Sequence, residues 1–316
     1  MSGSMDCCGL TDVGRKRKNN EDQFLIADVS KSMRVHQTSL ALDHQTRLFG
    51  DTKGKLLLVA DGMGGHEAGE RASQVVIDGI VDHTLNRLSW FMFNDCLTDD
   101  EFEEQLKQGL VECQRRIDRE VEAIPSRRGM GSTLTLCYIV WPRMFLVHVG
   151  DSRCYLLRGG VLQQLTRDHT LAELSEAIRR KAEDTGEGLD DMPDESLGPM
   201  AHVLWNAIGG AEQDPHPDAQ ALNLEIGDTL LLCTDGLNKH LSKRQITEIL
   251  SLPIKTDEKC QVLVEAANDA GGTDNITVVI SSFTKDTESL EANAEIELPL
   301  NDALPNTDEF FEPIPS

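Results

Sequence analysis

Basic residues are scarce in this chain of 316 residues. Lysine and arginine number 30 against 54 aspartates and glutamates, which gives a formal net charge of -24. A surface that binds nucleic acid needs a basic stripe to neutralise phosphates, and we therefore expect no nucleic-acid partner. Much of the acidity can serve solubility alone, but carboxylates that cluster need a cation among them.

The sequence also has no long apolar run, no secretory-signal pattern in its first residues and no cysteines at CxxC spacing. No run approaches the roughly 20 residues that a membrane span requires, and the start, MSGSMDCCGL, lacks the basic and apolar regions of a secretory signal. None of the eight cysteines stands in a CxxC pair. Cys137, Cys154 and Cys233 lie inside apolar runs, as is typical of core residues in a reducing compartment. We predict a cytoplasmic protein without a membrane partner.

The hydrophobic pattern predicts strands interrupted by two-helix segments. Apolar residues recur at helical spacing from Ala72 to Leu88, with Leu85 among them, and again from Phe102 to Val121. Strand-like runs with hairpin-length turns follow, and two further helices precede a last strand, ITVVISSF. This order favours an α+β fold with antiparallel sheets whose outer faces are covered by helices.

We predict one catalytic domain over residues 5–284. Within it, residues 29–54 are polar and lack clear periodicity, so they are typical of a loop or hairpin insertion. Residues 168–205 form a charged segment between core strands, which often acts as a lid over a site. Residues 285–316 are acidic and punctuated by proline, which predicts a disordered tail, either simply solvated or used for docking through its two adjacent phenylalanines.

Four aspartates stand where apolar strand runs meet turns. They are Asp61, Asp151, Asp235 and Asp274. A carboxylate at the end of a stiff strand, next to a glycine or small polar residue, lets the backbone approach whatever the carboxylate holds. One such aspartate is an ordinary turn residue, whereas four predict ligands that converge at one edge of a sheet. Oxygen ligands of this kind suit Mg²⁺ or Mn²⁺ and not zinc.

Two segments supply further candidate site residues. In TDVGRKRKNNEDQF, Glu21 can add an oxygen ligand, Asp22 can support a ligand from behind, and Arg17 has the planar fork that matches a phosphate. In isolation this segment is more typical of a surface charge cluster. In VADGMGGHEAGERAS, Gly62 leaves its carbonyl oxygen accessible, and His66 is placed to protonate a leaving alkoxide.

Five segments, in this order, resemble the metal-dependent protein phosphatases (PPM, type 2C) in a compact bacterial form. They are RKNNED, ADGMGGHEAGERAS, GMGSTLTLCYI, HVGDSRCYLLRGG with LTRDHT, and CTDGL with GGTDNITVVI. Together they span residues 9–283. The resemblance implies a four-layer α-β-β-α sandwich of two antiparallel sheets flanked by helix pairs, which agrees with the pattern of strands and helices.

The resemblance implies a centre of two Mg²⁺ or Mn²⁺ ions and a weaker third site. One ion would be held by Asp61, Asp235 and Asp274. The other would be held by Glu21, Asp61 and the carbonyl of Gly62. Asp151, with Asp235, matches the third site.

The resemblance also assigns catalytic positions and a reaction. Arg17 matches a phosphate-binding arginine, Asp22 an acid behind the metal ligands, and His66 a general acid. The implied reaction is hydrolysis of phosphoserine and phosphothreonine by a water that the cations activate. We therefore expect no cysteine loop of the tyrosine-phosphatase kind. The implied partners are phosphorylated proteins, substrates of a serine/threonine kinase in bacterial signalling, and we expect a monomer.

The chain also departs from the family pattern. After Asp235 and Gly236 the family often has an aromatic or polar residue followed by an acid, whereas this chain continues with LNKH. His169, in LTRDHT, is expected to support the fold or anchor the lid. Two other functions stay open: an interaction module that binds phosphoproteins without turnover, and a phosphatase for small metabolites with a different lid.

Overall fold

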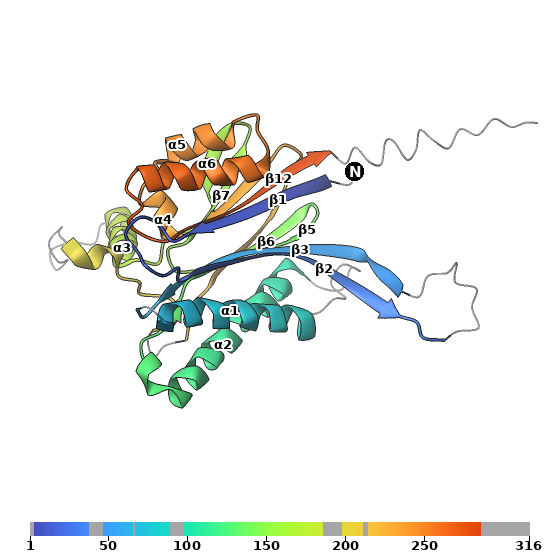
Figure 1. The fold of residues 1–316 in the computed structure, drawn as a ribbon, viewed down its shortest axis with the longest axis horizontal. Coiled ribbons are helices and arrows are strands. Elements are labelled where there is room, and N and C mark those ends of the chain that lie inside the picture. The colour runs from blue at the N-terminus through green and yellow to red at the C-terminus, as the bar shows by residue number, and fades with distance from the viewer. Residues whose placement is uncertain are drawn as a thin grey trace, which may run out of the picture.

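Two antiparallel sheets pack face to face and helices cover their outer sides (Figure 1). This computed structural model describes residues 3–37, 47–65, 67–88, 98–185, 198–210 and 214–285. The predicted α+β sandwich is therefore confirmed. The predicted tail, 285–316, lies outside the described residues apart from its first residue.

The first sheet joins the two ends of the described chain. Its order is β1 (Gly3–Asp12), β12 (Ile276–Lys285), β11 (Thr229–Cys233), β7 (Arg153–Arg158) and β8 (Val161–Gln164). Each neighbouring pair is antiparallel. β1 pairs with β12 along its whole length, from Gly3 opposite Lys285 to Asp12 opposite Ile276.

The second sheet is built around a long hairpin. Its order is β10 (Asp218–Asn223), β6 (Arg143–Val149), β5 (Leu134–Val140), β3 (Arg47–Met63), β4 (Gly131–Ser132) and β9 (Ile208–Gly209), and β2 (Asp22–Arg34) pairs with β3. The β2–β3 register runs from Asp22 opposite Asp61 out to Arg34 opposite Arg47. The described parts of 29–54, predicted as a loop or hairpin insertion, thus form the outer arms of this hairpin.

A helix pair lies on each outer face, as Figure 1 shows. α1 (Glu67–Asn86) and α2 (Asp99–Ala123) cover the second sheet, while α5 (Lys243–Leu250) and α6 (Thr256–Asp269) cover the first. Shorter elements, namely α4 (Asp235–Asn238), α3 (Leu171–Thr185), η2 (Pro125–Arg127) and η3 (Gly198–His202), complete the chain. Among the described helices, none is long and apolar enough to cross a membrane.

The core has one apolar layer between the sheets and one under each helix pair. Cys137, Cys154 and Cys233 are fully buried, which confirms them as core residues. Leu85 was predicted on the buried face of its helix, but its side chain is 60% exposed. It lies nine residues beyond the buried Val76, and at 3.6 residues per turn this separation points the two side chains to opposite faces of α1.

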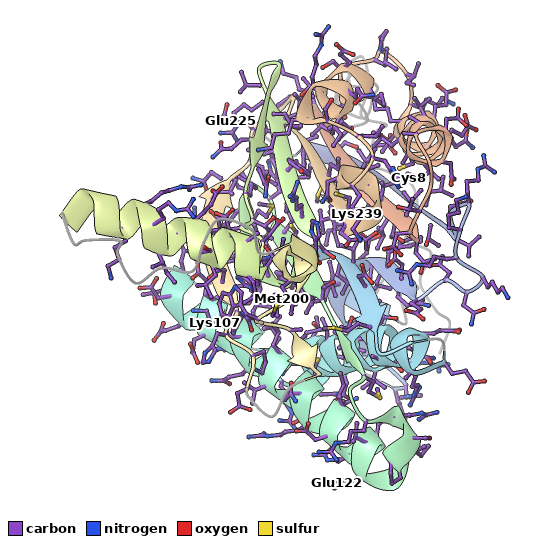
Figure 2. The ribbon with its side chains drawn as sticks, turned by 90° about the vertical axis from the view of Figure 1, so that its left-hand side faces the viewer. Cys8, Lys107, Glu122, Met200, Glu225 and Lys239 are labelled. Carbon is purple, nitrogen blue, oxygen red and sulfur yellow. The ribbon has the colours of Figure 1, made fainter. Side chains whose placement is uncertain are left out.

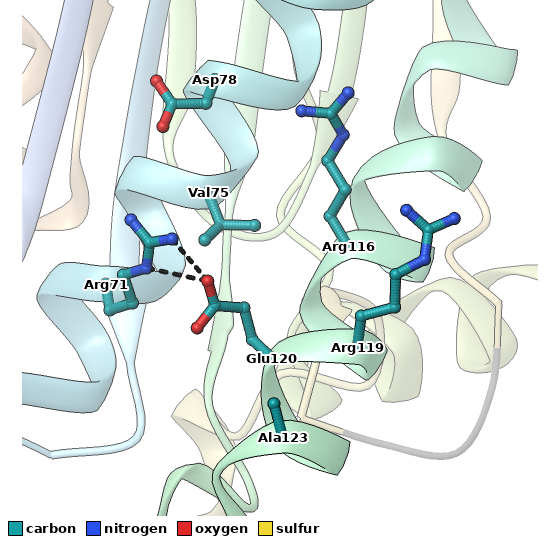
Figure 3. Close-up of a pocket in the computed structure, with 7 residues that line it drawn as sticks. All are labelled: Arg71, Val75, Asp78, Arg116, Arg119, Glu120 and Ala123. Atoms are coloured by element: carbon teal, nitrogen blue, oxygen red, sulfur yellow. Dashed lines mark hydrogen bonds and ion pairs between the residues drawn. The ribbon is translucent and has the colours of Figure 1, made fainter.

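Ion pairs fix α1 against α2. Arg71 of α1 pairs with Glu120 of α2 (Figure 3). Arg116 of α2 pairs with Asp82 of α1. Arg71, Glu120 and Arg116 border a hollow of about 340 Å³ between the helices. Because the Arg71 and Arg116 guanidinium groups already have carboxylate partners, we assign this hollow a structural role.

We predict that Phe102→Ala lowers the free energy of unfolding by about 3–5 kcal/mol, because it opens a cavity in the core. Phe102 is 1% exposed, and its ring centroid lies 4.4 Å from that of Phe145 and 5.3 Å from that of Tyr138. Urea unfolding followed by circular dichroism measures the loss. Leu85→Ala, at an exposed position, should change the value by less than about 0.5 kcal/mol. Equal losses in the two variants would contradict this account of the core.

Candidate active site

The predicted acidic residues come from strand ends of both sheets. Asp22 begins β2 and stands opposite Asp61 of β3 in the second sheet. Asp235 begins α4 just after β11, and Asp274 precedes β12, in the first sheet. Asp151 lies between β6 and β7, where the chain passes from one sheet to the other. The sandwich therefore gathers acids that lie more than 250 positions apart in the sequence.

Hydrogen bonds fix the backbone of Asp61. Its N–H donates to the hydroxyl oxygen of Thr133 at 2.9 Å. Its carbonyl oxygen accepts from the N–H of Thr133 at 2.9 Å and from the hydroxyl of Ser132 at 3.0 Å. Ser132 and Thr133 thus set the direction in which the Asp61 carboxylate leaves the strand.

Asp22 is only 2% exposed, so it does not belong to a surface charge cluster. Its Oδ2 accepts hydrogen bonds from the hydroxyls of Thr234 and Thr277, both at 2.7 Å. Burial, together with the charges of Asp235 and Asp274, raises the pKa of Asp22 to about 7 against the opposing effect of these hydroxyls. Asp22 therefore connects the second sheet to the ends of β11 and β12.

Two predicted ligand oxygens lie against one glycine of α1. A Cβ added to Gly69 would lie 2.7 Å from Oε2 of Glu21 and 3.0 Å from the carbonyl oxygen of Gly62. The Glu21 backbone is fixed as well, because its carbonyl accepts from Ser73 at 2.7 Å and its N–H donates to Oδ1 of Asn275 at 2.9 Å. Any side chain at position 69 would push these oxygens apart.

Two cationic side chains hold Asp235 and Asp274. The Arg17 fork contacts both carboxylate oxygens of Asp274, at 2.8 and 3.0 Å. Lys239 Nζ lies 2.9 Å from Oδ2 of Asp274 and also pairs with Oδ2 of Asp235. Burial alone would raise the pKa of Asp274, but Lys239 and Arg17 outweigh it and lower that pKa. For Asp235, burial prevails over Lys239 and raises the pKa.

Asp151 borders a cavity of about 270 Å³ together with Asp235 and Lys239. Burial and the charges of Asp235 and Asp168 raise the pKa of Asp151 to about 7, against the attraction of Lys239. Residues of the predicted lid, 168–205, line the other side of this cavity. Figure 2 looks at this end of the sandwich, with Lys239 labelled between the two helix layers.

His169 connects the Asp151 turn to the lid segment. Its Nδ1 accepts from the N–H of Gly150 at 3.2 Å and from the side-chain amide of Asn206 at 2.9 Å, while its Nε2 lies 3.1 Å from Oδ2 of Asp218. Two donors at Nδ1 assign the proton to Nε2, which donates to Asp218. His169 thus has the anchoring contacts that the sequence suggested.

Sequence reasoning did not assign site roles to Thr234, Thr277 or Lys239, and it left the role of Asn275 open. The Asn275 side-chain amide donates to the carbonyls of Val13 and Asn19, at 3.0 and 2.9 Å, so it ties the loop before Glu21 to β12. Thr234 and Thr277 lie close in sequence to Asp235 and Asp274, and this proximity was the signal that they could belong to the site. Their contact with Asp22 spans more than 200 residues and has no local pattern.

The donor set fits a hard divalent cation. Burial and the neighbouring charges of Asp22, Asp235, Asp151 and Asp274 raise the pKa of Asp61 well above its usual value, so a positive charge among these acids would relieve their repulsion. Oδ1 of Asp235 is buried and has no hydrogen-bond partner in the described part of the chain. All candidate ligands are oxygens, which suits Mg²⁺ or Mn²⁺.

The side chains are not yet arranged around an ion. In the described residues, no group of three or more His, Cys, Asp or Glu side chains is set to hold one as it stands. Lys239 and Arg17 draw the carboxylates of Asp235 and Asp274 toward themselves, so ligation requires these contacts to change. The predicted ligand set therefore stays a prediction, and His66 lies outside the described residues.

The Cys-x5-Arg spacing of tyrosine phosphatases does occur in the chain, from Cys113 to Arg119 and from Cys137 to Arg143. The first pair lies within α2, and the second runs from β5 into β6. Both cysteines are fully buried. Neither segment is a phosphate-binding loop, and neither thiol is accessible to a substrate.

Comparison with known proteins agrees with this arrangement. Residues 16–192 match the family model described as protein phosphatase 2C. The chain is 35% identical to serine/threonine phosphatase stp of Listeria innocua over 270 residues. This alignment covers 85% of the chain and 92% of the relative. It is 31% identical over 291 residues to protein phosphatase PhpP of Streptococcus pneumoniae, which covers 89% of this chain and 99% of the relative.

Solved structures show the same fold. The serine/threonine phosphatase PstP/Ppp of Mycobacterium tuberculosis aligns with a TM-score of 0.65 and 31% identity, covering 89% of this chain and 99% of that one. The catalytic domain of PstP in complex with 2 manganese ions aligns with a TM-score of 0.63 and 31% identity, covering 90% of this chain and 100% of that one. The chain therefore belongs to the protein phosphatase 2C family and is a serine/threonine phosphatase of the bacterial type.

Proposed function

We propose that the chain hydrolyses phosphoserine and phosphothreonine in proteins at a centre of two Mg²⁺ or Mn²⁺ ions. The ligands would be Glu21, Asp61, the carbonyl of Gly62, Asp235 and Asp274, with Asp151 beside them. The observation that carries this proposal is the convergence of buried and half-buried acids whose charges raise the pKa of Asp61, with an unpartnered Asp235 oxygen among them in the described chain. The manganese complex of the related PstP supports the choice of ion.

The bound cations would supply an activated water and positive charge for the reacting phosphoryl group. The chain's own residues supply position and protons. Ser132 and Thr133 orient Asp61, and Thr234 and Thr277 hold Asp22 behind the ligands. We assign His66 as the proton donor to the leaving serine or threonine oxygen, on its sequence position alone.

Arg17 is the residue best placed to bind the phosphate. Its side chain is 50% exposed and now pairs with Asp274. A guanidinium fork matches two phosphate oxygens as well as it matches a carboxylate. Half of its surface faces solvent, so Arg17 can turn from Asp274 toward an incoming phosphoryl group without opening the core.

We further propose that residues 5–284 are a single catalytic domain acting as a monomer in the bacterial cytoplasm. Its substrates would be proteins phosphorylated by a serine/threonine kinase. The names of the relatives, serine/threonine phosphatase and protein phosphatase, support this substrate class. The cavity of about 270 Å³ at Asp151 is bordered by residues of the lid segment.

We predict that Asp235→Asn lowers Mn²⁺-dependent hydrolysis of a phosphothreonine peptide by about 100-fold or more, the scale of losing one group that stabilises developing charge. Phosphate release with Mn²⁺, and again with EDTA, measures this effect. Asp269→Asn removes the same charge from an exposed position of α6 and should leave the rate unchanged.

Four results would contradict the proposal. Turnover that survives EDTA, or that survives Asp235→Asn, would exclude the metal centre. Faster hydrolysis of sugar phosphates than of phosphopeptides would favour a metabolite phosphatase. Phosphopeptide binding without any turnover would favour an interaction module.

The raised pKa values predict how the stability of the metal-free protein depends on pH. The pKa of Asp151 is about 7 in the folded chain, against about 3.9 for an unfolded aspartate. Between these values the folded chain binds the extra proton, so Asp151 makes the free energy of unfolding fall as pH rises. Asp151→Asn should therefore gain stability relative to the native chain between about pH 4 and 7, by about 1 kcal/mol or more.

Urea unfolding in EDTA at pH 4, 6 and 8 measures this difference. Asp269→Asn, at an exposed site, should give a curve parallel to that of the native chain. A parallel curve for Asp151→Asn would show that Asp151 ionises normally in the fold.

A further inference from the structure

Lys239 brings a positive charge into the acidic site. Its Nζ pairs with Oδ2 of Asp235 and lies 2.9 Å from Oδ2 of Asp274. These two aspartates are proposed ligands of the same divalent ion. The ammonium group therefore lies against the carboxylate oxygens that the divalent ion would bind.

Local structure keeps Lys239 in this position. It directly follows α4, four residues after Asp235, and residues at this spacing lie on one face of a helical turn. Its N–H also donates to the carbonyl of Asp235 at 2.9 Å. The contact with Asp235 thus follows from the one-turn helix and needs no distant support.

Contacts other than Lys239 also hold the Asp274 carboxylate in place. Its Oδ1 accepts from the N–H of Asn275 at 3.0 Å and contacts Nε of Arg17 at 2.8 Å. Lys239 approaches the other oxygen. Its ammonium therefore bridges the end of β11 and the start of β12 across the site.

The Lys239 side chain also borders a cavity into which it can move. The Lys239 side chain is 36% exposed and borders the cavity of about 270 Å³ whose wall includes Asp151. Asp151 is an acid of the same site. An ammonium that leaves Asp235 and Asp274 can therefore turn toward Asp151 and remain paired with a carboxylate.

We propose that Lys239 is a built-in cation of this site, which neutralises Asp235 and Asp274 in the metal-free protein and moves toward Asp151 when a divalent ion binds. The inference rests on the proposed metal centre. Two cations on the same carboxylate oxygens repel each other strongly, so the ion and the ammonium must alternate. An ammonium beside Asp151 would also stand where the sequence resemblance implies a third divalent ion.

The test compares Lys239→Met with Lys243→Met, using the full chain. Lys243 is an exposed residue of α5, so its substitution removes the same charge outside the site. Melting in EDTA gives the Tm of the metal-free protein, and titration calorimetry gives the Kd for Mn²⁺. We expect Lys239→Met to lower the metal-free Tm by about 2 °C or more and to tighten Mn²⁺ binding by about tenfold or more. Lys243→Met should change neither.

Lys239→Arg provides a further control, because it keeps the charge and should retain a metal-free Tm close to that of the native chain. Equal Mn²⁺ affinity and equal Tm in Lys239→Met and Lys243→Met would overturn the inference. Failure of every protein, the native chain included, to bind Mn²⁺ would overturn the proposed metal centre itself. Neither readout depends on turnover, so the two failures are distinguishable.

Discussion

Repulsion among buried and half-buried carboxylates is the constraint on which this site depends. Burial and mutual charge raise the pKa values of Asp22, Asp61 and Asp151, which a fold without a cation would have no reason to keep together. The rest of the structure opposes that repulsion. Strand pairing and the Thr234 and Thr277 hydroxyls hold the acids at the meeting edge of the two sheets, and Gly69 of α1 leaves room for the Glu21 carboxylate.

The sandwich explains why the acids are so far apart in sequence. Each sheet contributes strand ends, and the turn at Asp151 passes between the sheets. Asp22 joins the two halves directly, because it begins a strand of one sheet and accepts from two threonines of the other. Both sheets thus position the site, and a change in how they pack would displace the carboxylates.

The sequence predicted what periodicity and strand ends determine: the sheets, the flanking helices, the buried cysteines and the strand-end positions of the four aspartates. It was wrong at Leu85, where an apolar residue sits on the outer face of a helix. It could not predict the hydrogen bonds from the two threonine hydroxyls to Asp22, since those contacts join residues more than 200 positions apart. Lys239 appeared only as a departure from a pattern, and its two carboxylate partners required coordinates.

The pairing of β1 with β12 has a consequence for synthesis on the ribosome. β1 is an edge strand whose neighbour in the first sheet is β12. β1 is synthesised before the other described strands, but it cannot pair until β12, the last of them, has been synthesised. Asp274 arrives with that same last strand. A nascent chain cannot complete the acidic pocket until β12 has been translated, and a product truncated before β12 would have an unfinished sheet and no Asp274 beside it.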